Sequence, residues 1–316
     1  MHKQLPDFIL AGTVKSGSTS LYHYLDSHPE VYMSPVKEPH YFSFPDMDFS
    51  VFRPLIKKRL LSFNLEKYLE GNMKQKVHRA YIGDWEDYIR LFKNVKNEIA
   101  AGEASTSYLW SPGAAERIRE KLPQAKVILV LRDPVQRAFS HYLMDLKIKL
   151  AEGNFEKVLQ ADQSVKNPLW GKASMYIGLG MYFTQVKRYF DNFDPSNIHV
   201  VLYDDIKKSP EEVMNDLYRF LGVDQDFIPD FSVRHNAAML PANKVSSILT
   251  NNIFLRKNVI DKIGPGARRK LKKIFYRSEG IPQLSQQQKS ALLPFFAEDI
   301  VSLQKLIKKD LSHWLR

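Results

Sequence analysis

The chain of 316 residues contains no cysteine, which excludes disulfide bonds, thiolate metal sites and a cysteine nucleophile. It also has no long apolar run near its start, because only Phe8 to Ala11 is continuously apolar within MHKQLPDFILAG. Such a run is too short for the core of a signal peptide or for a membrane span. We therefore expect no transmembrane segment and, by default, a cytoplasmic location.

Internal repeats, low-complexity tracts and Ser/Gly-rich linkers are also missing, which favours one compact domain. Hydrophobic residues make up 44% and charged residues 26% of the chain, as in ordinary globular proteins. Lysine and arginine outnumber aspartate and glutamate by 46 − 35, a net charge of +11. This charge is consistent with an anionic partner, such as nucleic acid, an anionic glycan, a membrane surface or a phosphorylated cofactor. The basic clusters Lys57–Arg59, Arg268–Lys273 and Lys308–Lys309 are typical of solvated helix surfaces.

Short apolar runs that suit buried parallel strands recur along the first two thirds of the chain. Helix-like segments separate them, and this alternation predicts an α/β fold in which helices flank a central parallel sheet. The expected strands are Phe8–Ala11, Val31–Met33, Ile99–Ala101, Val127–Leu131 and Ile198–Tyr203.

Two crossover helices have readable starts, at Ser111-Pro112 and at Ser209-Pro210, because serine suits the N-cap and proline suits the first turn. The segment Ser43–His78 is too irregular to assign. Strand signals stop after about Phe231, and helical periodicity follows from Leu292 to Leu315.

We expect these elements to form one domain over residues 1–316. Residues 1–231 would form its α/β core, and residues 232–316 a loop and C-terminal helices packed on that core.

The stretch AGTVKSGSTSLYHYL, Ala11 to Leu25, follows an expected strand and leads into an apolar-periodic helix start. Gly12 and Gly17 keep the glycine spacing of the phosphate loop G-x-x-x-x-G-K-[ST], and Thr19 keeps its final hydroxyl. Glycines let backbone N–H groups point inward, and the helix N-terminus adds partial positive charge where an anion would sit. The loop is therefore a candidate phosphate cradle, with a tight turn that binds nothing as the alternative.

Ser18 stands where a nucleoside triphosphatase loop has its lysine, and the only lysine of this loop is Lys15. In such enzymes that lysine reaches the β- and γ-phosphates, and the following hydroxyl holds Mg²⁺. No expected strand ends in a convincing magnesium ligand, because Asp133 lies between Arg132 and Pro134, where it suits a helix cap. The pattern favours a phosphate ester bound without a metal.

The stretch VILVLRDPVQRAFSHY places Arg132 at the carboxyl end of an expected strand, which is the edge where open α/β sheets bind ligands. Ser140 follows about two helical turns later, so the pair could hold one phosphate from two sides. Alternatively, Arg132 could pair with Asp133 or a helix end.

The stretch SPVKEPHYFSF, Ser34 to Phe44, follows the second expected strand and should lie at the same edge of the sheet. It combines Lys37, Glu38 and His40 with aromatic side chains. Acid–base groups beside aromatic rings suit a bulky hydroxylated acceptor. A surface loop anchored by buried aromatic residues is the alternative.

Several ordered motifs together resemble the sulfotransferases that use 3′-phosphoadenosine 5′-phosphosulfate, especially the heparan sulfate (carbohydrate) branch. These motifs cover most of the chain and are KSGSTSLYHYLDSHPEV, KEPHYF, GEASTSYL, LRDPVQRAFSHY, IHVVLYDDI with RFLGV, and DLSHW. The resemblance implies a three-layer, P-loop-like fold and a metal-free reaction. The lack of a membrane anchor, unlike Golgi relatives, suggests a cytoplasmic, bacterial member.

The resemblance also implies roles for individual residues. The arginine and serine that bind the 3′-phosphate map to Arg132 and Ser140, and the general base maps to Glu38, with His40 as the second candidate. The glycan-modifying relatives often carry E-K-T-P-x-Y, whereas this chain has Ala104 in place of that lysine. The loop that binds the 5′-phosphosulfate maps to Lys15, Ser16, Gly17, Ser18, Thr19 and Ser20.

The resemblance implies in-line transfer of a sulfuryl group to an acceptor hydroxyl. Glu38 would take the hydroxyl proton, and Lys15 would stabilise charge on the leaving 5′-phosphate. We expect a glycan or glycolipid acceptor, with a small-molecule, lipid or carrier-bound hydroxyl as the alternative, and no nucleic acid partner. A degenerate P-loop kinase or nucleoside triphosphatase, and a non-catalytic anion- or glycan-binding protein, are more remote alternatives. The loop residues Arg234, His235 and Asn236 are candidates to close over the donor.

Overall fold

The computed structural model describes residues 5–61, 63–232, 240–241, 276–277 and 280–316. Its centre is a five-stranded sheet with the order β2-β3-β1-β4-β5, in which every neighbouring pair of strands is parallel. This arrangement confirms the predicted fold class. The strands are β1 (Phe8–Gly12), β2 (Val31–Met33), β3 (Ala100–Ser105), β4 (Lys126–Leu131) and β5 (Ile198–Leu202).

All five predicted strands form, and β3 differs most from the prediction. Ile99 lies outside it and is 47% exposed, while the strand continues to Ser105. Its sequence AAGEAS lacks the β-branched and aromatic residues that usually mark a strand. Gly102 is needed within it because a Cβ there would lie 2.4 Å from the ring of Phe8 on the neighbouring strand. The predicted last residue of the fifth strand, Tyr203, is instead the first residue of a helix, so β5 ends at Leu202.

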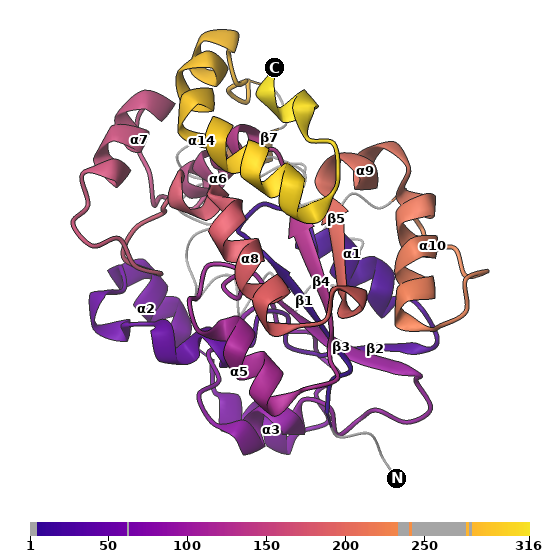
Figure 1. Ribbon diagram of the computed structural model, residues 1–316. Helices are drawn as coiled ribbons and strands as arrows, with labels where there is room; N and C mark the ends of the chain where they lie inside the picture. The colour runs from indigo at the N-terminus through magenta and orange to yellow at the C-terminus, as the bar shows by residue number, and fades with distance from the viewer. Residues whose placement is uncertain (1–4, 62, 233–239, 242–275, 278–279) are drawn as a thin grey trace.

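Helices cover both faces of the sheet, as Figure 1 shows. On one face, α1 (Ser18–Asp26) and α10 (Pro210–Leu221) contribute to a core that contains Leu10 and Val130. The core on the other face contains Ile9 and Leu129. Burial on both faces explains why the strands read as apolar runs without alternation. The helices of this second face are α5 (Ala114–Lys121), α6 (Pro134–Lys147), α8 (Tyr182–Asn192) and α14 (Gln286–Ile307).

The two predicted helix starts have different outcomes. Helix α10 begins at Pro210 with Ser209 at its N-cap position, as predicted. The start at Ser111-Pro112 was wrong, because α5 begins at Ala114 with Gly113 as N-cap. The hydroxyl of Ser111 donates instead to the carboxylate of Asp46, so it is not available to cap the helix.

The segment between β2 and β3, which the sequence left largely unassigned, forms short helices joined by loops. They are η1 (Tyr41–Asp46), η2 (Phe49–Val51), α2 (Pro54–Leu61), α3 (Leu65–Glu70) and α4 (Trp85–Arg90). The remaining short elements are α7 (Phe155–Gln163), η3 (Gly178–Gly180), η4 (Pro195–Asn197) and α9 (Tyr203–Lys208).

The C-terminal segment returns to the sheet domain, and its long helix α14 lies against α6 and α8 (Figure 1). Its buried side chains Leu292, Phe296, Ile300 and Leu303 form one stripe. Helix α14 ends at its C-cap residue Lys308, which has a left-handed φ of 53°. The last element of the chain is η6 (Ser312–Leu315). The sequence shows no strand signal after about Phe231, yet two short strands follow. These are β6 (Leu240–Pro241) and β7 (Tyr276–Arg277), which pair antiparallel. The cluster Arg268–Lys273 and the loop Arg234–Asn236 lie outside the described residues.

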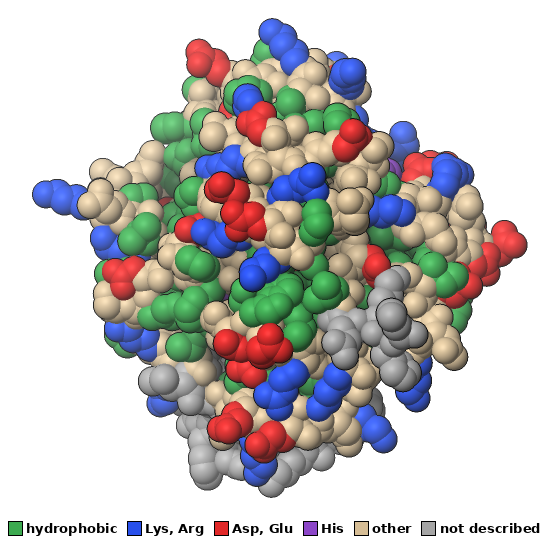
Figure 2. Space-filling model, turned by 60° about the horizontal axis from the view of Figure 1, so that its bottom comes forward, with side chains coloured by type: hydrophobic (Ala, Val, Ile, Leu, Met, Phe, Trp, Pro, Cys, Tyr) green, Lys and Arg blue, Asp and Glu red, His purple; other side chains and the backbone are tan. Residues whose placement is uncertain are grey.

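The molecular face in Figure 2 carries interspersed basic and acidic side chains around apolar ones. The net positive charge is therefore not gathered into one broad patch among the described residues visible there. Within the described ranges, no helix combines the length and the apolar character needed to cross a membrane.

Candidate active site

The predicted phosphate loop lies between β1 and α1, as the sequence indicated. Within it, Ser16 Oγ accepts a hydrogen bond from the amide of Thr13 at 3.3 Å, and Ser16 is fully buried. Both glycine positions leave little room for a side chain. A Cβ on Gly12 would lie 2.6 Å from Ser16 Oγ, and one on Gly17 would lie 2.5 Å from the ring of Tyr203. Gly17 also has a φ of 107°, a conformation that other residues rarely adopt.

Lys15 lies in this loop with a left-handed φ of 73°. Its side chain is partly buried, and its ammonium makes no hydrogen bond or ion pair with any residue that the structure describes. Burial, together with the positive charges of Arg132 and Lys147, lowers the pKa of Lys15 to about 8. A cation without a counter-ion in a positive environment favours an anionic ligand.

Arg132 follows β4 and is brought to the phosphate loop, at the sheet edge where the sequence placed both. Its Nη1 donates to the carbonyl oxygen of Lys15 at 3.3 Å, and its guanidinium lies 4.6 Å from the ring centre of Tyr203. Its Nε is buried and has no hydrogen-bond partner among the described residues. Asp133 caps α6 as predicted, accepting from the amides of Val135 at 2.9 Å and Gln136 at 3.1 Å.

Ser140 lies within α6 and is partly buried. Its hydroxyl makes no hydrogen bond in the described part of the chain, to Arg132 or to any other residue. Arg132 thus follows β4 directly and Ser140 lies in the helix that comes next, and no hydrogen bond joins the two.

Glu38 is held between the end of β3 and the segment 77–82. Its amide donates to the carbonyl of Ala104 at 2.7 Å, and its carbonyl accepts from the amide of Ala80 at 3.2 Å. Ala104, which stands where the glycan-modifying relatives have a lysine, is fully buried in β3. Glu38 and His40 have φ angles of 65° and 59°, so Lys15 and both candidate bases all adopt the left-handed conformation.

The carboxylate of Glu38 is clamped by two cations. Lys37 Nζ lies 3.0 Å from Oε1, and Arg79 donates to Oε2 through Nε at 3.0 Å and Nη2 at 2.9 Å. Burial by itself raises the pKa of this carboxyl, but the charges of Lys37 and Arg79 outweigh burial and hold the pKa well below its usual range. Glu38 is therefore ionised at neutral pH, and its oxygens point at protein donors.

His40 is fully buried beside Glu38. Its Nδ1 lies 2.6 Å from Ser107 Oγ, and its ring stacks on Tyr81 with 4.6 Å between ring centres. Its Nε2 has no hydrogen-bond partner among the described residues and lies 3.6 Å from Glu38 Oε2. Burial lowers the pKa of His40 to about 3, although the charge of Glu38 opposes this shift, so the imidazole is neutral.

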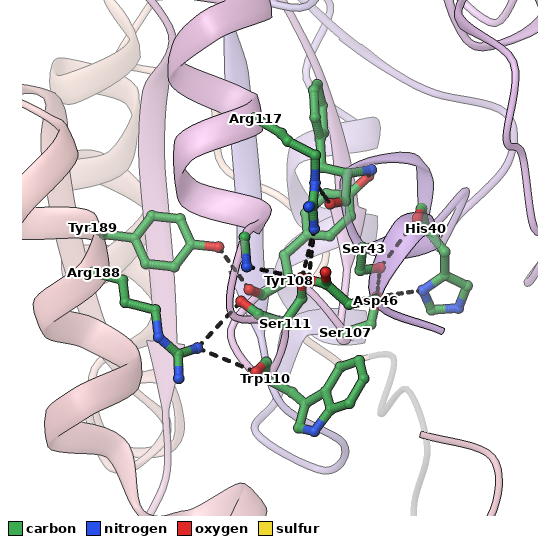
Figure 3. Close-up of polar contacts among 12 residues, drawn as sticks. His40, Ser43, Asp46, Ser107, Tyr108, Trp110, Ser111, Arg117, Arg188 and Tyr189 are labelled. Carbon is green, nitrogen blue, oxygen red and sulfur yellow. Dashed lines mark hydrogen bonds and ion pairs between the residues drawn. The ribbon is translucent and has the colours of Figure 1, made fainter. Parts of the chain in front are cut away.

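The turn that follows β3 supports His40, and Figure 3 shows how it is fixed. Ser107 Oγ lies 2.5 Å from Ser43 Oγ. On the other side of the turn, Arg188 Nη1 donates to the carbonyl of Trp110 at 3.2 Å. Arg117 Nε, from α5, reaches the carbonyl of Phe42 at 2.7 Å. These contacts tie the histidine loop to α5 and α8.

An aromatic cluster extends from His40 to the phosphate loop. Trp170 lies 5.8 Å from His40 and 5.6 Å from Trp110, measured between ring centres. Tyr81 and Val14, the residue before Lys15, pack against the same cluster. The described residues contain no group of three or more His, Asp and Glu side chains that could hold a metal ion.

Sequence reasoning missed several residues of this site. Arg79, Tyr81 and Trp170 lie in stretches without a motif. Tyr203 appears in the quoted stretch IHVVLYDDI, but no role was predicted for it. An arginine near a glutamate in three dimensions leaves no local trace, so the clamp on Glu38 had no sequence signal.

Comparison with known proteins gives consistent matches. A family model described as a sulfotransferase domain matches residues 5–269. A crystal structure of a sulfotransferase from Alicyclobacillus acidocaldarius is 30% identical, with a TM-score of 0.71, and the match covers 99% of each chain.

Curated relatives are more distant. Human carbohydrate sulfotransferase 15 is 26% identical over 251 residues, which cover 69% of this chain and 44% of the relative. Human bifunctional heparan sulfate N-deacetylase/N-sulfotransferase 3 is 26% identical over 224 residues, which cover 70% and 22%. The membrane-associated sulfotransferase kil1 of Dictyostelium discoideum is 23% identical over 332 residues, which cover 80% and 64%. The matched part is thus less than two thirds of each of these relatives.

Proposed function

The chain belongs to the sulfotransferase domain family, and from this premise we propose that it transfers a sulfuryl group from 3′-phosphoadenosine 5′-phosphosulfate to a hydroxyl group of a carbohydrate or glycoconjugate. One observation carries the proposal. The hydrogen bond from Arg132 to the carbonyl of Lys15, at 3.3 Å, joins to the phosphate loop a cation that has no acidic partner among the described residues. Two adjacent anion sites suit a donor that carries phosphate at both its 3′ and 5′ positions.

The residues present fit this nucleotide. Arg132 has a buried Nε without a partner in the described residues, and Lys15 presents an ammonium with no acidic partner there. The amides of Ser18 and Thr19 open α1 without an acceptor within the helix and favour an anion, whereas the amide of Ser20 donates to the carbonyl of Gly17 at 3.1 Å. We assign the 5′-phosphosulfate to Lys15, Gly17 and residues 18–20, and the 3′-phosphate to Arg132 and Ser140. Ser16, whose hydroxyl bonds Thr13, shapes the loop.

The donor supplies a sulfuryl group already activated by its bond to phosphate. The chain's own residues then have two tasks. Glu38 accepts the proton of the acceptor hydroxyl while the hydroxyl oxygen bonds to sulfur. Lys15 stabilises the negative charge left on the 5′-phosphate oxygen, and with a pKa of about 8 it is mostly protonated at pH 7.

Glu38 is the better base because it is ionised and lies at the sheet edge, although two cations clamp it. A carboxylate with such a low pKa is a weak base. Because its oxygens already pair with Lys37 and Arg79, the acceptor hydroxyl must compete with one of these cations for an oxygen. Arg79 is 41% exposed and Lys37 only 4%, so Arg79 is the partner that an acceptor can reach from solvent. His40 is the second candidate, because its unpartnered Nε2 lies 3.6 Å from the same carboxylate.

The aromatic cluster supports a sugar acceptor. The rings of Tyr81, Trp110 and Trp170 lie beside His40 and the phosphate loop, and flat rings with polar edges suit the faces of sugars. The names of the curated relatives agree with this class. The same wall could hold a small-molecule, lipid or carrier-bound hydroxyl, which is the alternative acceptor class. A nucleoside triphosphatase is disfavoured by Ser18 at the lysine position.

The test is transfer of labelled sulfate from the donor to a panel of glycan, lipid and phenolic acceptors. Glu38→Gln should lower kcat by about 10²- to 10⁴-fold, whereas Glu66→Gln, at an exposed position of α3, should leave kcat unchanged. Full activity in Glu38→Gln together with loss in His40→Asn would move the base to His40. Magnesium-dependent ATP hydrolysis without sulfate transfer would overturn the proposed function.

A further inference from the structure

Arg132, the residue assigned to the 3′-phosphate, is fixed by two tyrosines as well as by the phosphate loop. Tyr182 OH donates to the backbone carbonyl of Arg132 at 2.9 Å, and the ring of Tyr203 lies beneath its guanidinium. Tyr182 is fully buried. Arg132 is therefore held at both its backbone and its side chain before any ligand arrives.

The first of these tyrosines is held by α14. The carboxylate of Asp299, on α14, accepts from the backbone amide of Tyr182 at 2.7 Å and from that of Phe183 at 3.1 Å, and so caps the start of α8. The turn before α8 is packed tightly on the same helix, because a Cβ on Gly180 would lie 2.8 Å from the ring of Phe296. The position of Tyr182 thus depends on a helix more than 100 residues later in the chain.

The second tyrosine is held by the end of the chain. The indole Nε1 of Trp314 donates to Asp204 Oδ2 at 3.1 Å, and Asp204 directly follows Tyr203 at the start of α9. Trp314 is fully buried, and its ring centre lies 6.3 Å from that of Tyr182. The side chain of Trp314 therefore contacts both Tyr182 and Asp204, the neighbour of Tyr203.

We propose that the C-terminal segment, α14 and η6, positions Arg132 for the 3′-phosphate through two supports, Asp299 with Tyr182 and Trp314 with Asp204. This inference rests on the proposed function, because it takes Arg132 as the 3′-phosphate ligand. An arginine side chain loses much rotamer freedom when it binds, and fixing it beforehand reduces that loss. The segment acts as a set of positioning residues and touches neither nucleotide nor acceptor.

The experiment compares two nucleotides that differ only in the 3′-phosphate. Calorimetry measures Kd for adenosine 3′,5′-bisphosphate and for adenosine 5′-phosphate with wild type, Tyr182→Phe, Asp299→Ala and Trp314→Phe. Each variant should bind the bisphosphate about 3- to 30-fold more weakly, while Kd for the 5′-phosphate changes less than about 2-fold. The matched control is Tyr142→Phe, which removes another buried tyrosine hydroxyl that donates to a backbone carbonyl, that of Gly153 at 2.8 Å. It should change neither Kd.

The outcomes separate the inference from the proposed function. Equal weakening of both nucleotides would show that the segment only supports the fold, and unchanged binding in the variants would show that it does not position Arg132. Either result overturns the inference. If wild type itself fails to prefer the bisphosphate, the assignment of Arg132 and with it the proposed function are wrong. Tyr182→Phe and Trp314→Phe act on different supports, so the test stands if one of them does not fold.

Discussion

The lowered pKa of Lys15 leads to a specific prediction about nucleotide binding. Burial and the charges of Arg132 and Lys147 bring the pKa of this ammonium to about 8, within the range of an ordinary binding assay. The charged form is favoured by a bound phosphate and disfavoured by the empty, positive site. Affinity for adenosine 3′,5′-bisphosphate should therefore fall as pH rises through 8.

The size of the effect follows from the charged fraction. With a pKa of about 8, Lys15 is about 90% charged at pH 7 and about 10% charged at pH 9. If the charged form binds the nucleotide, Kd should rise about tenfold between these values. Above pH 7 the phosphates, with a second pKa near 6, are already ionised and contribute little to the change.

The assay is a calorimetric titration at half-unit steps from pH 7 to 9.5, with wild type, Lys15→Arg and Lys15→Met. An arginine stays charged across this range, so Lys15→Arg should bind with nearly constant affinity. Lys15→Met should bind weakly at every pH and approach wild type only at pH 9.5. A wild-type Kd that does not change across the range would refute the reasoning, because it would mean that Lys15 does not meet a phosphate.

Two further predictions concern buried carboxyl groups. Arg79→Met removes two of the donors to Glu38, so the pKa of Glu38 should rise and the acid limb of the kcat profile should move to higher pH. Initial rates from pH 4 to 8 measure it, and an unmoved limb would assign the base to another group. Glu103 is a fully buried residue of β3. Burial raises its pKa to about 7, so the folded chain binds this proton more tightly than the unfolded chain between about pH 4.5 and 7. Stability should fall across that window by about 1.4 kcal/mol per pH unit from this group, about 3 kcal/mol in all. Urea unfolding at pH 5.5 and 8 measures the fall in stability, and Glu103→Gln should remove it. Equal falls in the wild type and the variant would show that Glu103 is not the group whose raised pKa causes the fall.

The features that the sequence predicted correctly have local causes. The loop between β1 and α1, whose phosphate-binding role stays a prediction, is defined by glycines five residues apart, one of which has a left-handed φ. Arg132 is placed by the apolar strand immediately before it and by the cap residue Asp133 immediately after it. Such features are encoded within about ten residues, and a single sequence carries enough information to place them at one sheet edge.

The features that the sequence did not predict depend on partners far along the chain. The clamp on Glu38 joins residues separated by 41 positions, and the bond between Ser111 and Asp46 spans 65. Because Ser111 bonds to the carboxylate of Asp46 and does not cap the helix, α5 begins later than predicted, at Ala114. β3 was predicted too short because packing against Phe8, and not side-chain propensity, selects Gly102.

The order of the sheet separates the two halves of this site along the chain. The candidate donor residues come from the ends of β1, β4 and β5, in the middle and at one side of the sheet. Glu38, Arg79 and Tyr81 all belong to the single excursion between β2 and β3, which leaves from the strand at the opposite edge. The excursion returns to β3, an interior strand, and is tied to it by the hydrogen bond from the Glu38 amide to the carbonyl of Ala104 at 2.7 Å. The proposed general base and the arginine that holds it are therefore supplied by one segment, which is separate along the chain from the residues proposed to bind the donor.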